Sequence, residues 1–304
     1  MTERILLRYS GGQGEEISVC LCLVCFCVNS HVRNRLNRNP YGEEDDMAFN
    51  EIVKMHEDLD RALKKPVSKR SWVMVIDVRK CVGDRACVVA CMAENVCPPG
   101  TSYRWVFGTE YRGYPDLDKF YMPGNCQHCD NPPCLKAANK LKKGAIEKRP
   151  DGIVVFDYQK LKGSSGAKEA AGKACPYYAI VDDNGGYYTD NTPILEPYET
   201  RTFYEYNERL TRKKIKGTIR KCTFCVHRLE SGMIPACVST CIGRAMYFGD
   251  KADPKSLVSE LIKREDVWNP KANLGTKPRV YYIGYKDRAN IATGTSVTCR
   301  VCHQ

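Results

Sequence analysis

Cysteine is the residue type whose number and spacing indicate chemistry in this sequence. The chain has 18 cysteines among 304 residues, and many of them stand two or three residues apart. Such tight pairs favour metal ligation over a disulfide framework, which does not require them. An iron–sulfur cubane needs four anionic ligands around a compact core. Bacterial proteins supply these ligands in the pattern C-x2-C-x2-C-x3-C-Pro, whose fourth cysteine binds the other cluster of a pair.

Four runs of this sequence can be aligned with that pattern. The first is complete in spacing but has an aspartate in its second position. The second lacks its fourth cysteine, the third keeps only its fourth, and the last is complete. The runs are Cys81-x2-Asp84-x2-Cys87-x3-Cys91, Cys126-x2-Cys129-x4-Cys134 with Ala138 where the fourth cysteine should stand, Cys175-Pro176, and Cys222-x2-Cys225-x11-Cys237-x3-Cys241.

The missing ligands indicate how the runs pair. If the fourth cysteine of each run crosses to its partner, runs two and three form one pair and runs one and four form the other. All the missing positions then belong to one cluster, which is absent as a whole, and no cluster ligand is left over. Three 4Fe-4S clusters are predicted. Their ligands are the first set (Cys81, Asp84, Cys87, Cys241), the second set (Cys91, Cys222, Cys225, Cys237) and the third set (Cys126, Cys129, Cys134, Cys175).

Asp84 distinguishes the first set from the other two. A carboxylate is a harder ligand than a thiolate and holds iron in such a cluster less firmly. The iron atom that it faces can therefore be labile, so this cluster could interconvert with a 3Fe-4S form. The alternative is that Asp84 is a surface residue beside a three-iron cluster. Two histidines inside the cluster loops, His128 and His227, are expected to pack or support rather than to ligate.

Zinc is the alternative metal, since C-x2-C pairs also form zinc knuckles, but the rows of cysteines here crowd too many ligands for one tetrahedral ion. Seven cysteines fall outside the three sets. The pairs Cys22-x2-Cys25 and Cys299-x2-Cys302 could close a zinc site between the termini, or could be free thiols in poorly ordered tails. The seven are Cys20, Cys22, Cys25, Cys27, Cys97, Cys299 and Cys302.

Short strands are expected next to the cysteine loops. Residues 72–77 and 152–157 are apolar segments that precede cysteine runs, and residues 178–181 and 245–248 follow them. A strand, a cysteine loop, a short helix and a strand recur along the chain, which suggests repeated ferredoxin-like modules. The predicted fold class is α+β, with two pseudo-twofold-related ferredoxin-like modules and inserted loops, one of them over residues 185–212.

Three regions are predicted: an N-terminal extension or arm (1–70), a multi-cluster domain (71–290) and a C-terminal tail (291–304). Residues 52, 55, 59 and 63 are apolar and share one face of a helix. Residues 1–46 differ in composition from the rest. They could dock on a partner, be disordered, or be spurious if translation begins at Met47.

Charge and hydropathy narrow the class of protein. The formal net charge is +11, with Lys and Arg spread along the chain, and no nucleic-acid-binding signature accompanies it. A large acidic protein partner is therefore expected, and nucleic acid is not. The apolar stretch of residues 17–28 is too short to cross a bilayer as a helix, and no secretory signal is evident. A cytoplasmic protein without a membrane anchor of its own is predicted, unless a partner exports it.

Two segments resemble a known family. Cys126-Gln-His-Cys129-Asp-Asn-Pro-Pro-Cys134 and Arg149-Pro-Asp-Gly-Ile-Val-Val-Phe156 are similar to motifs in the ferredoxin-like electron-transfer (beta) subunits of dimethyl-sulfoxide-reductase-family molybdopterin oxidoreductases. The resemblance covers roughly residues 71–290. It implies iron–sulfur clusters in a chain, with the Asp84 cluster nearest a molybdenum or tungsten catalytic subunit. In that family the cluster missing here lies at the far end, next to a membrane subunit.

Two features resemble the small subunits of pyrogallol–phloroglucinol transhydroxylases: the loss of that cluster and the segment of residues 274–282. Those enzymes are soluble, contain molybdenum and act on phenols. Asp84 departs from the four cysteines expected there, and the immunoglobulin-like domain of that subunit is not expected after Gln304.

The prediction is a non-catalytic subunit of anaerobic metabolism that relays single electrons to or from a Mo or W subunit acting on phenolic or related substrates. The alternatives are the iron–sulfur subunit of a membrane-bound anaerobic respiratory reductase or dehydrogenase, and a zinc-binding interaction module.

Overall fold

The computed structural model describes residues 43–98, 100–111, 118–183 and 217–286, and side chains from residue 50 onwards except those of 109–118. The chain divides into a unit of residues 1–46 and a unit of residues 47–304. Only residues 43–46 of the first unit are described, at the beginning of helix α2 (Glu43–Leu63). The following paragraphs concern the second unit.

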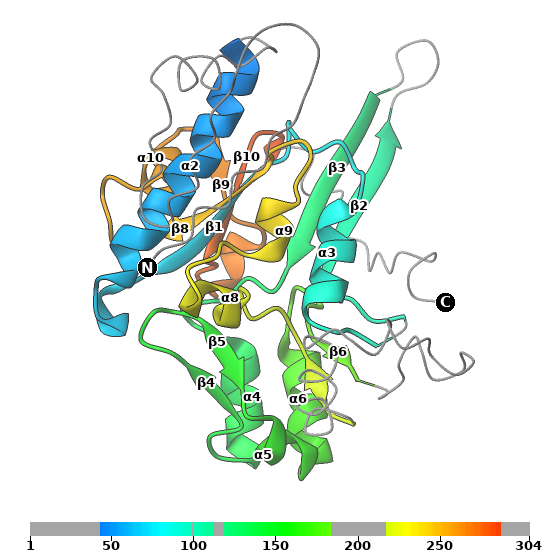
Figure 1. Cartoon of the computed structure of the whole chain (residues 1–304). Helices are drawn as coiled ribbons and strands as arrows, with labels where there is room; N and C mark the ends of the chain where they lie inside the picture. Colours follow the sequence, from blue (N-terminus) through cyan, green and yellow to red (C-terminus); the bar gives the residue numbers. More distant parts are fainter. Residues whose placement is uncertain (1–42, 99, 112–117, 184–216, 287–304) are drawn as a thin grey trace, which may run out of the picture. The chain divides into compact units, whose positions relative to one another are not determined.

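A four-stranded sheet forms the centre of the main core (Figure 1). Its strand order is β8-β1-β10-β9, with β1 parallel to β10 and antiparallel to β8. All six residues of β1 and all five of β8 are buried, as expected of strands covered on both faces. The four strands are β1 (Trp72–Asp77), β8 (Met246–Asp250), β9 (Val267–Trp268) and β10 (Val280–Ile283).

Helices α2 and α10 (Leu257–Ile262) pack on the sheet. Met55 and Leu59 of α2 are almost fully buried, and the backbone N–H of Phe248 in β8 contacts the Met55 sulfur at 3.4 Å. A carboxylate oxygen of Asp58 accepts the backbone N–H of Leu257, at the start of α10, at 2.7 Å. Residues 47–63 therefore belong to the same core as β1.

The cysteine-bearing segments connect the remaining elements. A hairpin of β2 (Arg104–Tyr111) and β3 (Asp118–Asn125) lies beside helix α3 (Ala86–Glu94), and α3 packs on the short helix α9 (Ala236–Ser239). The remaining short elements are η1 (Val67–Lys69), β6 (Val181–Asp182), β7 (Ile219–Arg220), α8 (Val226–Glu230) and η3 (Ala272–Leu274).

A second, smaller core lies between α4 (Pro133–Leu141) and α6 (Ser165–Ala174), which pack on each other and on the β4–β5 ribbon. Small residues allow the close approach, since Ala138, Ala167 and Ala171 are all fully buried. The ribbon is made of β4 (Ile146–Lys148) and β5 (Val154–Phe156), and α5 (Tyr158–Lys162) follows it.

The described part mixes helices and strands, and the strand predicted at residues 72–77 is confirmed at those limits. The strand predicted at 245–248 is displaced to 246–250, and that at 152–157 is shortened to Val154–Phe156. The strand predicted at 178–181 is wrong for its first three residues, because Tyr178 has a left-handed backbone conformation (φ 51°) that a strand cannot contain.

The helical face at residues 52–63 is confirmed, with Met55 and Leu59 buried. The pseudo-twofold relation of two modules and the region limits at residues 70 and 290 stay predictions. The insertion at 185–212, the C-terminal tail and most of the N-terminal extension lie outside the described residues.

Candidate iron–sulfur sites

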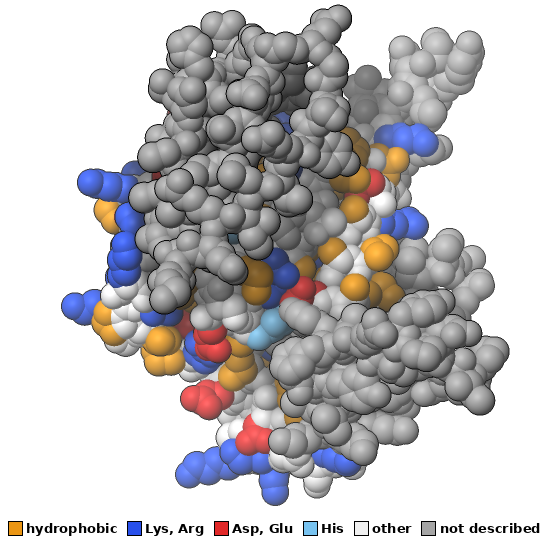
Figure 2. Space-filling view, in the orientation of Figure 1, with side chains coloured by type: hydrophobic (Ala, Val, Ile, Leu, Met, Phe, Trp, Pro, Cys, Tyr) orange, Lys and Arg blue, Asp and Glu red, His pale blue; other side chains and the backbone are white. Residues whose placement is uncertain are grey.

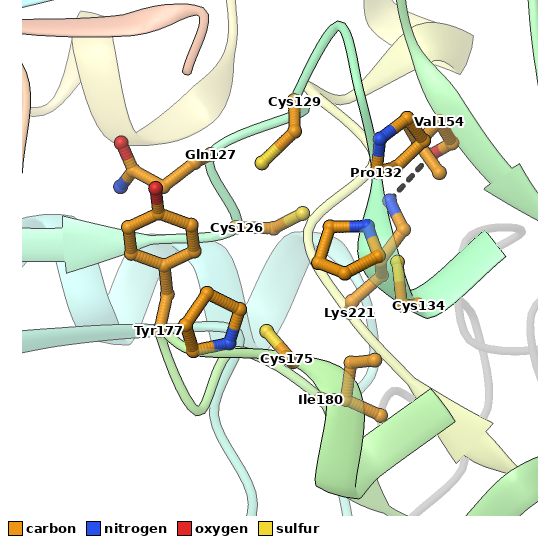
Figure 3. A pocket seen from close by; sticks show the side chains of 12 residues that line it. Cys126, Gln127, Cys129, Pro132, Cys134, Val154, Cys175, Tyr177, Ile180 and Lys221 are labelled. Carbon is orange, nitrogen blue, oxygen red and sulfur yellow. Dashed lines mark hydrogen bonds between the residues drawn. The ribbon is translucent and has the colours of Figure 1, made fainter. Parts of the chain in front are cut away.

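The third set of cysteines lines one cavity (Figure 3). Cys126 follows β3, Cys129 lies in the next loop, Cys134 is in the first turn of α4, and Cys175 caps the C-terminal end of α6. Pro132 and Pro176 help to fix these positions. Pro132 has an extended backbone, and α4 begins at the following residue. Cys175 precedes Pro176, and a helix rarely continues into a residue that precedes proline, so α6 ends before Cys175. Four thiols from two segments of the chain, residues 126–134 and residue 175, therefore surround a common space.

The four thiols of this cavity lie close to one another. Cys129 interacts electrostatically with all three other members of the third set. The sulfur atoms point into the cavity from different sides in Figure 3. In the described part of the chain, no group of three or more His, Cys, Asp or Glu side chains has the spacing of ligands to one metal ion.

Burial makes these thiols costly to ionise on their own. It raises the pKa of Cys129 and of Cys134 to about 12, and it is the main cause for Cys222 as well, whose pKa is also raised to about 12. Iron–sulfur clusters are held by thiolates. The positive charge of bound iron offsets the cost of burying these anions, so the donor set fits such a group.

The first set lies nearest the surface. Cys81 interacts electrostatically with Cys87, Cys241 and Asp84, so the structure brings the four predicted members together. Cys81 is half-buried and Asp84 is exposed, whereas Cys87 and Cys241 are buried. One Asp84 carboxylate oxygen accepts the backbone N–H of Ala86, at the start of α3, at 2.6 Å. The carboxylate therefore also holds the beginning of the cysteine-bearing helix.

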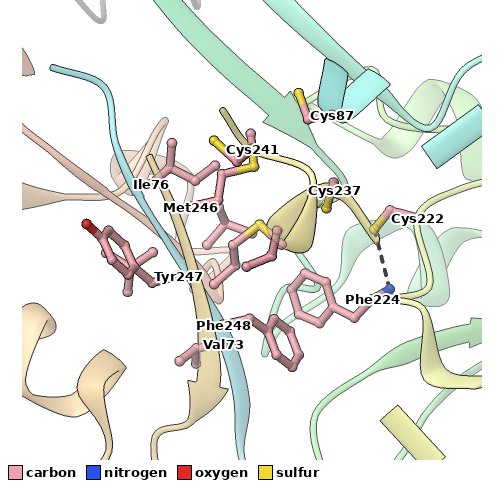
Figure 4. Packing of buried hydrophobic residues seen from close by; sticks show 14 of the residues in the cluster. Val73, Ile76, Cys87, Cys222, Phe224, Cys237, Cys241, Met246, Tyr247 and Phe248 are labelled. Carbon is pink, nitrogen blue, oxygen red and sulfur yellow. Dashed lines mark hydrogen bonds between the residues drawn. The ribbon is translucent and has the colours of Figure 1, made fainter. Parts of the chain in front are cut away.

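The second set is wholly buried. Cys91, on α3, interacts electrostatically with Cys222, Cys225 and Cys237, which come from a segment more than a hundred residues later in the chain. Figure 4 shows Cys222 and Cys237 beside the core residues of β1 and β8. Cys225 has a left-handed backbone (φ 50°), as has Phe224 before it, and this turn places Cys222 and Cys225 on one short loop.

The three sets follow one another in space. Cys87 of the first set interacts with Cys237 of the second, and Cys222 of the second interacts with Cys126 of the third. The second set therefore lies between the other two. This order permits stepwise transfer of electrons from one end of the series to the other.

Polar hydrogens lie near several of these sulfur atoms. Cys241 accepts the backbone N–H of Ala245 at 3.2 Å, and Cys222 accepts that of Phe224 at 3.4 Å. The Asn95 side chain donates to the Cys91 sulfur at 3.5 Å. Hydrogen bonds to cluster sulfurs are among the determinants of reduction potential. The asparagine is not recognisable from the cysteine spacing.

Two buried cations also escape sequence reasoning. Lys221 lines the cavity of the third set and donates to the backbone oxygens of Val154 and Cys222. Arg104, the first residue of β2, is buried among cysteines of the other sets. The only sequence signal is the position of Lys221 directly before Cys222. Nothing in the pattern around Arg104 indicates its place.

The two histidines occupy supporting positions. His128 is fully buried, accepts the backbone N–H of Val154 through its Nδ1 at 3.1 Å, and stacks on Phe224. Burial, with Lys221 nearby, holds the pKa of His128 well below its usual value. His227 pairs with Glu94 at 2.7 Å. Cys97 is buried, and the other six cysteines outside the three sets lie outside the described residues.

Comparison with known proteins gives a consistent class. A model of the 4Fe-4S dicluster domain matches residues 117–191 and 204–251. One subunit of a selenate reductase from Mesobacillus selenatarsenatis is 48% identical over 235 residues, which cover 76% of this chain and 78% of that protein. The iron–sulfur subunit of an arsenate respiratory reductase from Shewanella sp. is 35% identical, over 69% of this chain and 94% of that protein. This chain belongs to the family of reductase iron–sulfur subunits.

The same family includes one subunit of the tetrathionate reductase of Salmonella typhimurium, which is 33% identical over 72% of this chain and 74% of that protein. The chain is therefore an iron–sulfur electron-transport protein that carries 4Fe-4S clusters and acts as a subunit of an oxidoreductase. Among the helices that the structure describes, none is both long and apolar enough to cross a bilayer.

Proposed function

We propose that the chain relays single electrons through three iron–sulfur clusters, held by the first, second and third sets, to or from a molybdopterin catalytic subunit. Each cluster, when bound, accepts and releases one electron. The observation that carries the proposal is the spatial series of the three sets, in which Cys87 neighbours Cys237 and Cys222 neighbours Cys126. The protein supplies the thiolates, excludes water from the second set and keeps neighbouring sets close.

The number of clusters is supported by what occupies the place of the fourth. Ala138 stands where run two would have its last cysteine, and Ala171 stands at a cysteine position of run three. Both alanines are fully buried in the small core between α4 and α6, together with Ile146 and Val154. Apolar side chains fill this region, and alanine stands at both positions where a fourth cluster would need cysteine.

The surface near the first set suits contact with a partner. Val82 and Ile242 are 58% and 69% exposed and adjoin the ligands Cys81 and Cys241, and Val89, on the α3 helix that carries Cys87, is 65% exposed. Exposed apolar side chains around a half-buried ligand are typical of an interface rather than of a free surface. We place the catalytic subunit there, so that electrons enter or leave at the Asp84 end.

Asp84 differs from the other ligands in its chemistry, and the proposal gives it a defined role. One carboxylate oxygen is engaged by the N–H of Ala86, which leaves the other for iron. With Asp84 as a ligand, three complete clusters require about twelve iron atoms per chain. If Asp84 only begins the helix, the first cluster has three irons and the total is about eleven.

The substrate of the partner is proposed from two observations that favour different answers. The relatives named above belong to selenate, arsenate and tetrathionate reductases, which favours an anaerobic respiratory reductase of an oxyanion. The absent fourth cluster favours a complex without a membrane subunit, as in the transhydroxylases of phenols. Assays of the purified complex with selenate, arsenate, tetrathionate and pyrogallol, each with a dye of matching potential, discriminate between the two.

The remaining parts of the proposal concern the setting of the chain. On the face in Figure 2, described Lys and Arg side chains stand at several separate places, with acidic and hydrophobic side chains between them. This dispersal supports a protein partner over nucleic acid. We also propose two ferredoxin-like modules related by a pseudo-twofold, and a cytoplasmic location without a direct membrane anchor, which cell fractionation tests.

The first test is iron and acid-labile sulfide per chain, on protein purified without oxygen together with its partner. About twelve iron atoms with matching sulfide support a relay in which Asp84 is an iron ligand, and about eleven support a relay in which Asp84 only begins the helix. Iron near sixteen contradicts the pairing of the runs, and zinc without sulfide contradicts electron transfer altogether. Molybdenum or tungsten in the co-purified large subunit is the expected sign of the catalytic partner.

A further inference from the structure

Arg104 is a fully buried cation at the boundary between two of the thiol sets. It is the first residue of β2, and only 1% of its surface is exposed. No carboxylate is among its hydrogen-bond partners in the described part of the chain. One terminal nitrogen, Nη1, contacts the sulfur of Cys237 at 3.2 Å and that of Met74 at 3.7 Å. A buried guanidinium of this kind is costly unless anions surround it.

The surrounding groups belong to both neighbouring sets. Arg104 interacts electrostatically with Cys237, Cys222 and Cys91 of the second set and with Cys87 of the first. Arg104 in turn lowers the pKa of Cys87, although burial, the largest influence, raises the pKa of that thiol overall. The charge of Arg104 is therefore shared between ligands of two clusters rather than paired with one carboxylate.

Two of its donor groups have no protein partner. Nε and Nη2 of Arg104 are buried and make no hydrogen bond to the described residues. Buried donors are almost always satisfied, so an unpartnered pair calls for an explanation. Arginine presents its five N–H groups in a fixed planar fork, which can serve acceptors on more than one side at once.

We propose that Arg104 is a positioning and charge-compensating residue of the relay, whose guanidinium donates to the sulfur of the first two clusters and raises the reduction potentials of both. The inference rests on the proposed function, because it needs the first and second sets to hold clusters. Each reduction adds one electron and hence one negative charge, which the fixed positive charge of Arg104 stabilises. Arg104 itself stays protonated, so no proton is exchanged.

The third set provides an internal reference. The largest electrostatic interactions of Arg104 are with thiols of the first two sets, and the buried cation beside the third set is Lys221. Removal of the charge of Arg104 should therefore lower the potentials of the first two clusters and change that of the third less. A general loosening of the protein would instead affect all three.

The test compares Arg104→Lys, Arg104→Gln and Arg104→Met in the complex with its partner. Iron and sulfide are counted first, and reduction potentials are then measured by redox titration followed by electron paramagnetic resonance. The surface variant Arg264→Gln makes the same change in net charge at a residue that is 43% exposed in its side chain and pairs with Asp266. It is expected to keep all potentials.

We expect Arg104→Gln and Arg104→Met to keep their iron and to favour the oxidised state of two clusters at least tenfold, a shift of about 59 mV for one electron. Arg104→Lys should stay closer to the parent protein. Loss of iron from the first two clusters in both neutral variants, with retention in Arg104→Lys, would also support the charge role.

Unchanged potentials in the neutral variants, an equal shift of all three clusters, or loss of iron in all three variants would overturn the inference. A parent protein with fewer than about eleven iron atoms would instead count against the proposed function, so the two failures are distinguishable.

Discussion

Gly243 is the position at which one added methyl group should damage one cluster. It follows Cys241 of the first set by two residues. A Cβ at residue 243 would stand 2.2 Å from the backbone oxygen of Lys80, the residue before Cys81. Carbon–oxygen contacts in proteins are rarely shorter than 3.0 Å, so the two loops must separate by about 1 Å. The obstructing atom is backbone and cannot swing away as a side chain could.

The expected cost of Gly243→Ala is about 1–3 kcal/mol of folding stability, the usual range for overpacking. The more specific effect is on iron. Because Cys81 and Cys241 are both members of the first set, separating their loops should release that cluster, and iron should fall by about three or four atoms per chain. Iron analysis and electron paramagnetic resonance of the first cluster measure this loss.

Gly172→Ala is the matched control. Nothing lies within 4 Å of a Cβ built at Gly172, in the interior of α6, so the same substitution there has open space. Alanine is favoured over glycine inside a helix by about 0.5–1 kcal/mol, so this variant should melt slightly higher and keep all its iron. Full iron and an unchanged signal in Gly243→Ala would show that the two loops do not meet as described.

Three further predictions probe the core, the third set and a helix cap. Leu59→Ala should lower the free energy of unfolding by about 2–5 kcal/mol in a denaturant titration, since Leu59 is only 2% exposed. Val53→Ala, at a 38% exposed position of the same helix, should change the free energy of unfolding little. Equal costs for the two variants would contradict the packing of α2. Cys175→Ala should lose about four irons and Cys97→Ala none, although both cysteines are buried; iron loss in both would contradict the ligand assignment. Asp157→Asn should destabilise by about 0.2–1 kcal/mol near neutral pH, because asparagine caps a helix about as well as aspartate and only the charge contact with the nearby lysine is lost. In the folded state the pKa of Asp157 is lowered, first by the backbone N–H and then by the side chain of the lysine three residues later. The carboxylate therefore stabilises the fold above the unfolded pKa, and this contribution is lost as the pH falls through the folded pKa. The gap between the melting curves of Asp157→Asn and the parent should close in acid, and a constant gap would contradict the cap.

Local features of the fold could be predicted from the sequence where one physical rule dominates. The β1 segment is a continuous apolar run, and a strand buried on both faces reads that way. The grouping of cysteines followed from the rule that only one pairing of the runs leaves no cluster ligand unused, and the structure brings the members of each set together. Their role as iron ligands stays a prediction that iron analysis tests.

What could not be predicted depends on contacts between distant segments. Arg104 lies 133 residues before Cys237 in the sequence, and no local spacing relates the two. The strand expected at 178–181 failed for a local reason instead. The chain turns sharply after Cys175 to direct that sulfur into the cavity, and Tyr178 takes a left-handed conformation within the turn. Apolar residues beside a ligand were interpreted as a strand, whereas the site required a turn.

The placement of the cysteines also has a consequence for folding. Cys91 meets Cys222, Cys225 and Cys237 across a long stretch of chain, and the main hydrophobic core contains members of all three sets. Without iron, these contacts join thiols that burial keeps protonated, because burial disfavours the thiolate form. Contacts between neutral thiols add little to hold the loops together. A bound cluster would convert each set into a cross-link that closes a long loop, and such a cross-link removes much of the entropy of the unfolded chain. The thiol sets that order the electron path would therefore also tie the hairpin, α3 and α9 to the sheet, and iron binding and folding of this unit should be coupled.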